Sequence, residues 1–82
     1  MLLFGQLLDV INDNELLIVR SSHERSIVFI DELRASEART LLTKDSRTCV
    51  VSDFYSDISE RDSKESVSVI YIKPNGKFIL LE

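Results

Sequence analysis

The first dozen residues show the helical spacing of apolar positions. Four apolar side chains are spaced three and four residues apart, with polar side chains between them, so they line one face of a helix. We therefore predict a helix over residues 3–12. The polar cluster at 12–14 ends it, because such side chains compete for backbone hydrogen bonds. The four apolar residues are Phe4, Leu7, Leu8 and Ile11.

The next two apolar segments are too short for that helical spacing. Residues 15–20 contain Leu-Leu-Ile-Val and residues 26–30 contain Ile-Val-Phe-Ile. Runs of this length suit strands whose two faces are both partly buried. We expect them to form a hairpin. The polar connection at 21–25 has no glycine, so its turn type stays open.

The middle of the chain is less regular. Leucines and alanines allow a short helix over residues 36–43, with Ser36 as its cap. After a polar connection, residues 48–55 are strand-like in residue type and form the predicted third strand. Residues 59–66 contain no apolar side chain and mix both charges. We expect a mobile polar loop there.

The clearest strand pattern lies in the last sixteen residues. Two apolar runs flank Pro74-Asn75-Gly76, whose residue types close a tight turn, so residues 67–82 are predicted to form a hairpin. Its predicted register pairs Lys73 with Lys77, and alternation then makes both faces apolar. One predicted face carries Val69, Tyr71, Ile79 and Leu81, and the other carries Ile70, Ile72, Phe78 and Leu80.

These elements predict a single α+β domain over residues 1–82. Its sheet has about five strands, mostly antiparallel, in the chain order α-β-β-α-β-β-β. The N-terminal helix packs on one face, and the second helix is short. One full helix leaves the other face uncovered, so we expect a homodimer or a protein partner there. The candidate interface residues are Val69, Tyr71, Ile79 and Leu81.

Composition narrows the classes of partner. The chain has 82 residues, a net charge of −4 and an ordinary globular composition with 44% hydrophobic residues. The acidic balance argues against direct binding of nucleic acid or an anionic membrane. The lone Cys49 cannot form an internal disulfide and no export signal is visible, so we expect a cytoplasmic protein. We infer no small-molecule substrate.

Candidate chemistry is sparse. Cys49 and His23 are the only thiol and imidazole, and they supply too few soft ligands for a structural zinc site. Asp53 and Asp57 on one extended strand would lie about 13 Å apart, too far to share an ion. The two glycines are not in a glycine-rich loop. We therefore predict no catalytic residues, no metal site and no cofactor.

One stretch has a distinct charge. Between residues 53 and 65, five acidic residues stand against two basic ones, with serines between them. Such a stretch could act as a solubilising loop or could imitate a phosphate backbone toward a basic partner. The acidic residues are Asp53, Asp57, Glu60, Asp62 and Glu65.

The segment from Phe4 to Asp13, followed by a strand and a closing apolar hairpin, resembles small uncharacterised accessory proteins of Gram-positive phages and conjugative elements. That group implies no activity and no catalytic residues. The leading interpretation is a non-enzymatic interaction module that binds a protein partner or itself through a sheet face or edge. The alternative is an acidic inhibitor or regulator of a host defence or nucleic-acid enzyme. A small enzyme acting through Cys49 ranks third.

Overall fold

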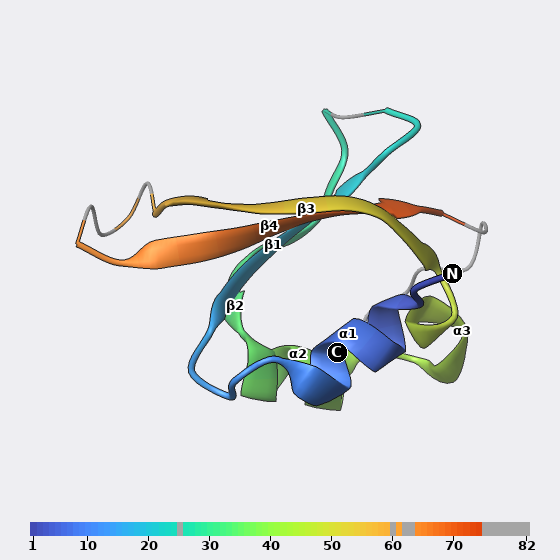
Figure 1. Cartoon of the computed structure of the whole chain (residues 1–82), viewed down its shortest axis with the longest axis horizontal. Helices are drawn as coiled ribbons and strands as arrows, with labels where there is room; N and C mark the ends of the chain where they lie inside the picture. Colours follow the sequence, from blue (N-terminus) through green and yellow to red (C-terminus); the bar gives the residue numbers. More distant parts are fainter. Residues whose placement is uncertain (25, 60, 62–63, 75–82) are drawn as a thin grey trace.

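The computed structural model describes residues 1–24, 26–59, 61 and 64–74. In this part of the chain, a four-stranded sheet lies on a layer of three helices (Figure 1). The α+β class predicted from the sequence is confirmed. In chain order the elements are α1 Phe4–Val10, β1 Leu16–Ser21, β2 Val28–Arg34, α2 Ala35–Leu41, α3 Lys44–Arg47, β3 Val50–Ile58 and β4 Ser66–Lys73.

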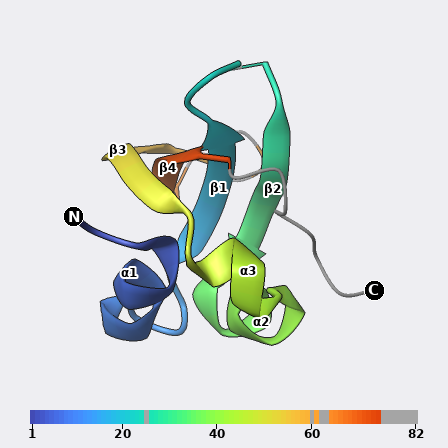
Figure 2. The same ribbon diagram turned by 90° about the vertical axis from the view of Figure 1, so that its right-hand side faces the viewer.

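The sheet is mixed, and its strand order is β2-β1-β4-β3. The predicted first hairpin is confirmed, since β1 and β2 pair antiparallel. β3 and β4 form a second antiparallel pair. The two pairs join through β1 and β4, which run parallel, with Leu16 opposite Val67 and Ser21 opposite Ile72. All three helices lie on one side of this sheet (Figure 2).

The central position of β4 explains its two apolar faces. On the face toward the helices, here called the inner face, Ile70 and Ile72 pack with residues of α1, β1 and α2. On the opposite, outer face, Val67, Val69 and Tyr71 pack with Leu16. A strand with neighbours on both sides and side chains buried on both faces reads as a continuous apolar run. The described core therefore has a cluster on each face of β4.

The second strand of the predicted terminal hairpin, with its pairing of Lys73 and Lys77, falls on residues 75–82, which lie outside the described residues. In the described part of the chain, β4 has β1 on one edge and β3 on the other. These two pairings satisfy the backbone groups of β4.

Several predicted boundaries also change. The first helix is shorter than expected, and the second ends at Leu41, after which the expected polar connection forms the short helix α3. Thr43 starts α3, because its side chain accepts a hydrogen bond from the Ser46 amide. β2 continues to Arg34, where we had expected no strand, and β3 covers 50–58 instead of 48–55.

Two contacts hold the helix layer together. A Cβ on Gly5 would lie 2.9 Å from the Cβ of Arg47, so glycine lets α1 approach α3 closely. Arg39 of α2 reaches back to the end of α1, where its guanidinium donates to the carbonyl of Leu8 at 2.6 Å and also to that of Ile11. These carbonyls lack partners within a short helix, and the arginine supplies them.

Polar contacts tie the connection between β3 and β4 to β2. The Ser59 hydroxyl donates to the buried carboxylate of Glu32, and Arg34 pairs with Glu65 at 2.5 Å. Glu32 has a φ of 52°, in the left-handed region that non-glycine residues rarely adopt. The described ends of the predicted loop 59–66 therefore have specific partners on β2.

Candidate functional site

β3 forms one edge of the sheet, and its free side is only partly occupied. Next to its start, the chain before α1 runs alongside it. The Val51 amide donates to the carbonyl of Leu2 at 2.9 Å, and the Phe4 amide donates to that of Cys49 at 2.8 Å. Leu3 thus pairs with Val50 as an isolated antiparallel bridge. This short segment closes the edge of β3 as far as Val51.

Beyond Val51, alternation of the backbone groups identifies those that face the open side. At the far end, the Ser59 amide donates to the carbonyl of Glu65, so Ser59 faces the β4 side. Backbone N–H and C=O groups point to the same side of a strand at every second residue, so those of Asp57, Tyr55 and Asp53 also face β4.

Phe54, Ser56 and Ile58 alternate with these residues, so their backbone groups face away from β4. The register shift between Val51 and Asp53 reconciles this count with the outward amide of Val51. The amide of Ile58 is bonded to the Asp57 carboxylate. Among the described residues, Phe54 and Ser56 present their amides without a partner.

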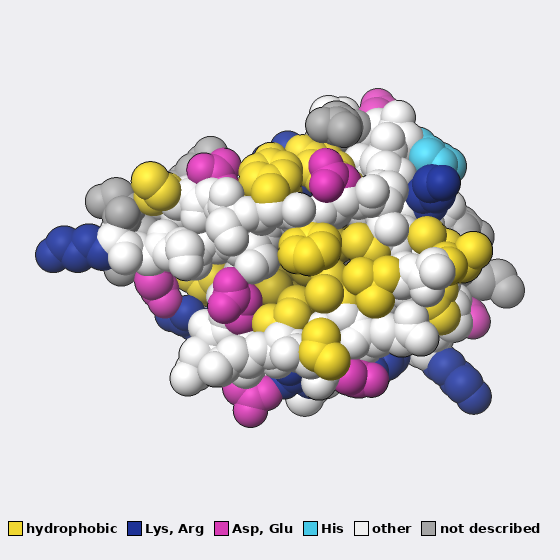
Figure 3. Space-filling model, viewed as in Figure 1, with side chains coloured by type: hydrophobic (Ala, Val, Ile, Leu, Met, Phe, Trp, Pro, Cys, Tyr) yellow, Lys and Arg dark blue, Asp and Glu magenta, His cyan; other side chains and the backbone are white. Residues whose placement is uncertain are grey.

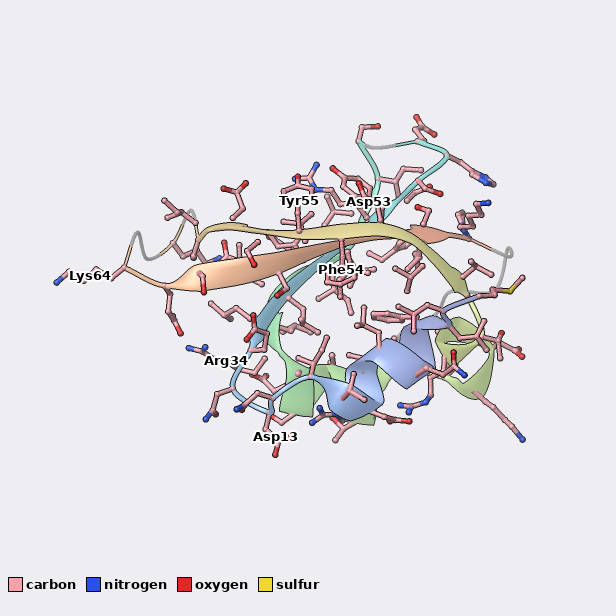
Figure 4. All side chains as sticks on the ribbon, in the orientation of Figure 1. Asp13, Arg34, Asp53, Phe54, Tyr55 and Lys64 are labelled. Atoms are coloured by element: carbon pink, nitrogen blue, oxygen red, sulfur yellow. The ribbon has the colours of Figure 1, made fainter. Side chains whose placement is uncertain are left out.

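The side chains of this segment are unusually exposed for a strand rich in large residues. All residues from Ser52 to Ile58 are exposed. Phe54 is 54% exposed and Ile58 is 64% exposed. Phe54 points to the helix side of the sheet, whereas Asp53 and Tyr55 point away from it (Figure 4).

Apolar side chains also gather beside this strand. Figure 3 shows a patch of hydrophobic atoms between β3 and α1 on one side of the molecule. Val10, at the end of α1, is 80% exposed. An open edge lined by apolar side chains is the feature by which extended chains bind sheets, and also the feature that drives association of strands.

The outer side of β3 is polar and aromatic. Tyr55 stacks on Tyr71 with ring centroids 6.2 Å apart. The hydrogen bond with Tyr71 raises the pKa of Tyr55 above its ordinary value, and desolvation and the charge of Asp57 act in the same direction. Asp53 and Asp57 lie on either side of Tyr55 on this face. The edge therefore has an apolar inner side and an acidic outer side.

The opposite edge strand is less regular. The pairing of β2 with β1 shifts register twice, between Leu17 and Val19 and again between Val19 and Arg20. Glu32 adds its left-handed backbone. Such irregularities disrupt the even row of backbone groups that a further strand would need. β3 is thus the better template of the two.

The residues predicted as an interface have a different setting. Val69 and Tyr71 lie on the outer face of β4 and are only 4% and 6% exposed, so little of either can reach a partner in this conformation. Ile79 and Leu81 lie outside the described residues. The three helices cover the inner face, and yet the outer cluster around Val69 is also buried.

The candidate chemical residues do not assemble into a site. Cys49 is buried just before β3, and His23 is exposed in the connection between β1 and β2. Within the described ranges, no three histidine, cysteine or carboxylate side chains group as metal ligands, and no pocket is hollowed. Of the acidic stretch, Glu65 is paired with Arg34, while Glu60 and Asp62 lie outside the described residues.

The sequence alone did not identify the open edge of β3, because its residue types do not distinguish an edge strand from a central one. The signal that was present is the sequence Phe-Tyr-Ser-Asp-Ile at 54–58, with apolar residues at its two ends. Whether such residues are exposed depends on which strands neighbour them, and strand order was not readable from the local pattern.

The described residues thus form a small α+β domain with a mixed sheet and one open, partly apolar edge strand. No family model matches the chain, and no curated protein and no solved structure is similar to it. No helix among those described is long and apolar enough to cross a bilayer.

Proposed function

We propose that this protein is a non-enzymatic interaction module that binds a protein chain, either a second copy of itself or another protein, through the open edge of β3. The observation that carries the proposal is the free segment 53–58, where outward amides combine with the exposed side chains of Phe54 and Ile58. An added strand would satisfy the amides and bury the apolar side chains at the same time.

The acidic-inhibitor alternative gains less support. Asp57 already accepts a hydrogen bond from the Ile58 amide, and Glu65 is paired with Arg34. Engaged carboxylates such as these are less available to imitate a row of phosphates. The exposed apolar side chains of the same strand are also foreign to a phosphate mimic, because a nucleic-acid backbone presents charge and not apolar surface.

The proposal can be tested by site-specific photo-cross-linking in extracts of the native cell. We expect benzoylphenylalanine in place of Phe54 to give a discrete covalent adduct with a protein chain. The same group in place of Ser36, exposed on α2, should give none. Equal labelling from both positions, or no discrete adduct from position 54, would contradict the proposal.

A further inference from the structure

We propose that the chain that occupies the edge of β3 is a second copy of this protein, paired antiparallel about a two-fold axis that passes beside Ser56. This inference rests on the proposed function and specifies its partner. The free edge is short, and its ends are fixed by contacts already described. At one end Leu2–Phe4 occupy the edge, and at the other Ser59 turns toward Glu65.

Symmetry limits the possible registers. Two copies of one edge strand pair antiparallel about a two-fold axis perpendicular to the sheet. One residue then lies opposite the same residue of the second copy, and the inner faces of both sheets lie on the same side. Within the segment 53–58, that central residue is Phe54, Tyr55, Ser56 or Asp57, and the last is disfavoured because it would place two Asp57 carboxylates directly opposite each other. Each choice places different side chains opposite one another, and their charges and sizes can be compared.

The register centred on Tyr55 is disfavoured by repulsion between like charges. It places Asp53 of each copy directly opposite Asp57 of the other, and like charges directly opposite destabilise a strand pair. The register centred on Phe54 is excluded by steric overlap. It would place Asp57 and Ile58 of the second copy beside Val51 and Val50, where Leu2 and Leu3 already lie.

The register centred on Ser56 avoids both conflicts. On the inner face, Phe54 of each copy lies opposite Ile58 of the other, so two exposed apolar side chains cover each other twice. On the outer face, Tyr55 lies opposite Asp57, so no two like charges lie directly opposite each other there. The two Ser56 residues face each other and can exchange backbone hydrogen bonds, because their groups point to the open side.

The helix layer fits this arrangement. Since equal faces lie on the same side, the two helix layers lie on one side of a continuous eight-stranded sheet. α1 is the helix nearest to the β3 edge (Figure 2), so the α1 helices of the two copies approach each other near the axis.

Disulfide trapping tests the register. In a hydrogen-bonded antiparallel pair the Cα atoms are about 5.5 Å apart, within the range of a disulfide. Ser56→Cys should therefore yield a covalent dimer under mild oxidation. Asp53→Cys is the matched control, since its two copies would lie six residues apart along the strands, about 20 Å.

A third variant separates the registers. The native Cys49 is buried and is common to all variants. Tyr55→Cys should cross-link poorly, because its copies are diagonal in the Ser56 register. Efficient cross-linking through Tyr55→Cys or Asp53→Cys in place of Ser56→Cys would overturn the register, and so would equal rates for all three.

Analytical sedimentation of the purified protein tests whether the partner is a second copy of the chain. We expect a concentration-dependent dimer whose dissociation constant rises on the order of tenfold in Phe54→Asp, because two copies of one cross-strand pair are lost. Val28→Asp, on the other edge strand, is the control and should leave dimerisation unchanged. If Phe54→Asp does not fold, as judged by circular dichroism, Ile58→Asp makes the same test.

The outcomes distinguish this inference from the proposed function. A protein that remains monomeric at hundreds of micromolar overturns the second copy as partner. If benzoylphenylalanine at position 54 then labels a different protein, the β3 edge is still a binding site and its partner is another chain. If neither a dimer nor an adduct forms, both proposals fail.

Discussion

At the scale of single residues, Glu32 combines two properties that are rarely found together. Its backbone has a φ of 52°, and its carboxylate is buried and accepts a hydrogen bond from Ser59. A left-handed backbone costs a non-glycine residue about 1–2 kcal/mol. Its side chain offsets that cost by linking β2 to the connection between β3 and β4.

Replacing Glu32 separates the backbone from the side chain. Glu32→Gly and Glu32→Ala both lose the carboxylate, but only glycine relieves the strain, so we expect the glycine variant to be about 0.5 kcal/mol more stable. At the neighbouring Asp31 the order should be reversed, with glycine less stable than alanine. Urea unfolding of the four variants measures this, and the same order at both positions would contradict it.

Tyr55 is the residue whose ionisation reports the outer face. Because the hydrogen bond with Tyr71 raises its pKa, the folded protein holds the phenolic proton more tightly than the unfolded chain does. The stability from this contact is complete below pH 10, near the ordinary tyrosine pKa, and is lost as the pH rises through the raised value.

We therefore expect the Tyr55 ring to titrate at a higher pH than an ordinary tyrosine. In Tyr71→Phe, which keeps the ring and removes the hydroxyl, the pKa of Tyr55 should move back toward its ordinary value. The ¹³Cζ resonance of Tyr55, followed by NMR over alkaline pH, measures both. An unchanged midpoint in Tyr71→Phe would show that Tyr71 is not the cause.

At the scale of elements, α1 depends on its contacts with other helices. It has seven residues, and isolated helices of that length are not stable in water. Arg39 of α2 supplies donors to the carbonyls of Leu8 and Ile11 and pairs with Asp13. One side chain thus joins the end of α1 to α2.

Arg39→Leu should lower the free energy of unfolding by about 2 kcal/mol, because it removes charged donors from partly buried carbonyls. Arg39→Lys should recover part of this loss. The control is Arg61→Leu, which breaks an exposed ion pair with Asp31 at 3.4 Å and should cost less than about 0.5 kcal/mol. Equal losses in Arg39→Leu and Arg61→Leu, measured by thermal and urea unfolding, would argue against this role.

At the scale of the whole molecule, β1 and β4 join the two apolar clusters. Leu17, Val19, Ile70 and Ile72 face the helices, while Leu16, Val67, Val69 and Tyr71 face the other way. Because the same two strands supply both sets, the clusters cannot separate without loss of the parallel pair. We expect the described core to unfold as one cooperative unit.

Ile70→Ala tests this cooperativity. Ile70 is fully buried on the inner face, so its truncation should cost about 2–5 kcal/mol. Tyrosine fluorescence, which reports the outer cluster through Tyr71, should shift to lower urea together with the far-ultraviolet circular dichroism. Val10→Ala, at an exposed site, should change neither. A fluorescence midpoint that stays at the wild-type value would show that the two faces unfold separately.

The sequence by itself determined the local elements of this protein. Apolar spacing at Phe4, Leu7 and Leu8 specified a helix and its buried face. The Leu-Leu-Ile-Val run of β1 and the two apolar faces of β4 indicated strands buried on both sides. These features are short-range, since side-chain direction repeats with a fixed period in helices and strands.

Only the tertiary structure decided which strands are neighbours. The local pattern did not indicate that β4 pairs with β1, some fifty residues earlier, as well as with β3. That order buries Val69 and Tyr71, which looked available, and leaves Phe54 and Ile58 exposed at the edge. A strand pattern shows which side chains share a face but not which edge is free, because backbone pairing depends on residues far apart in the chain.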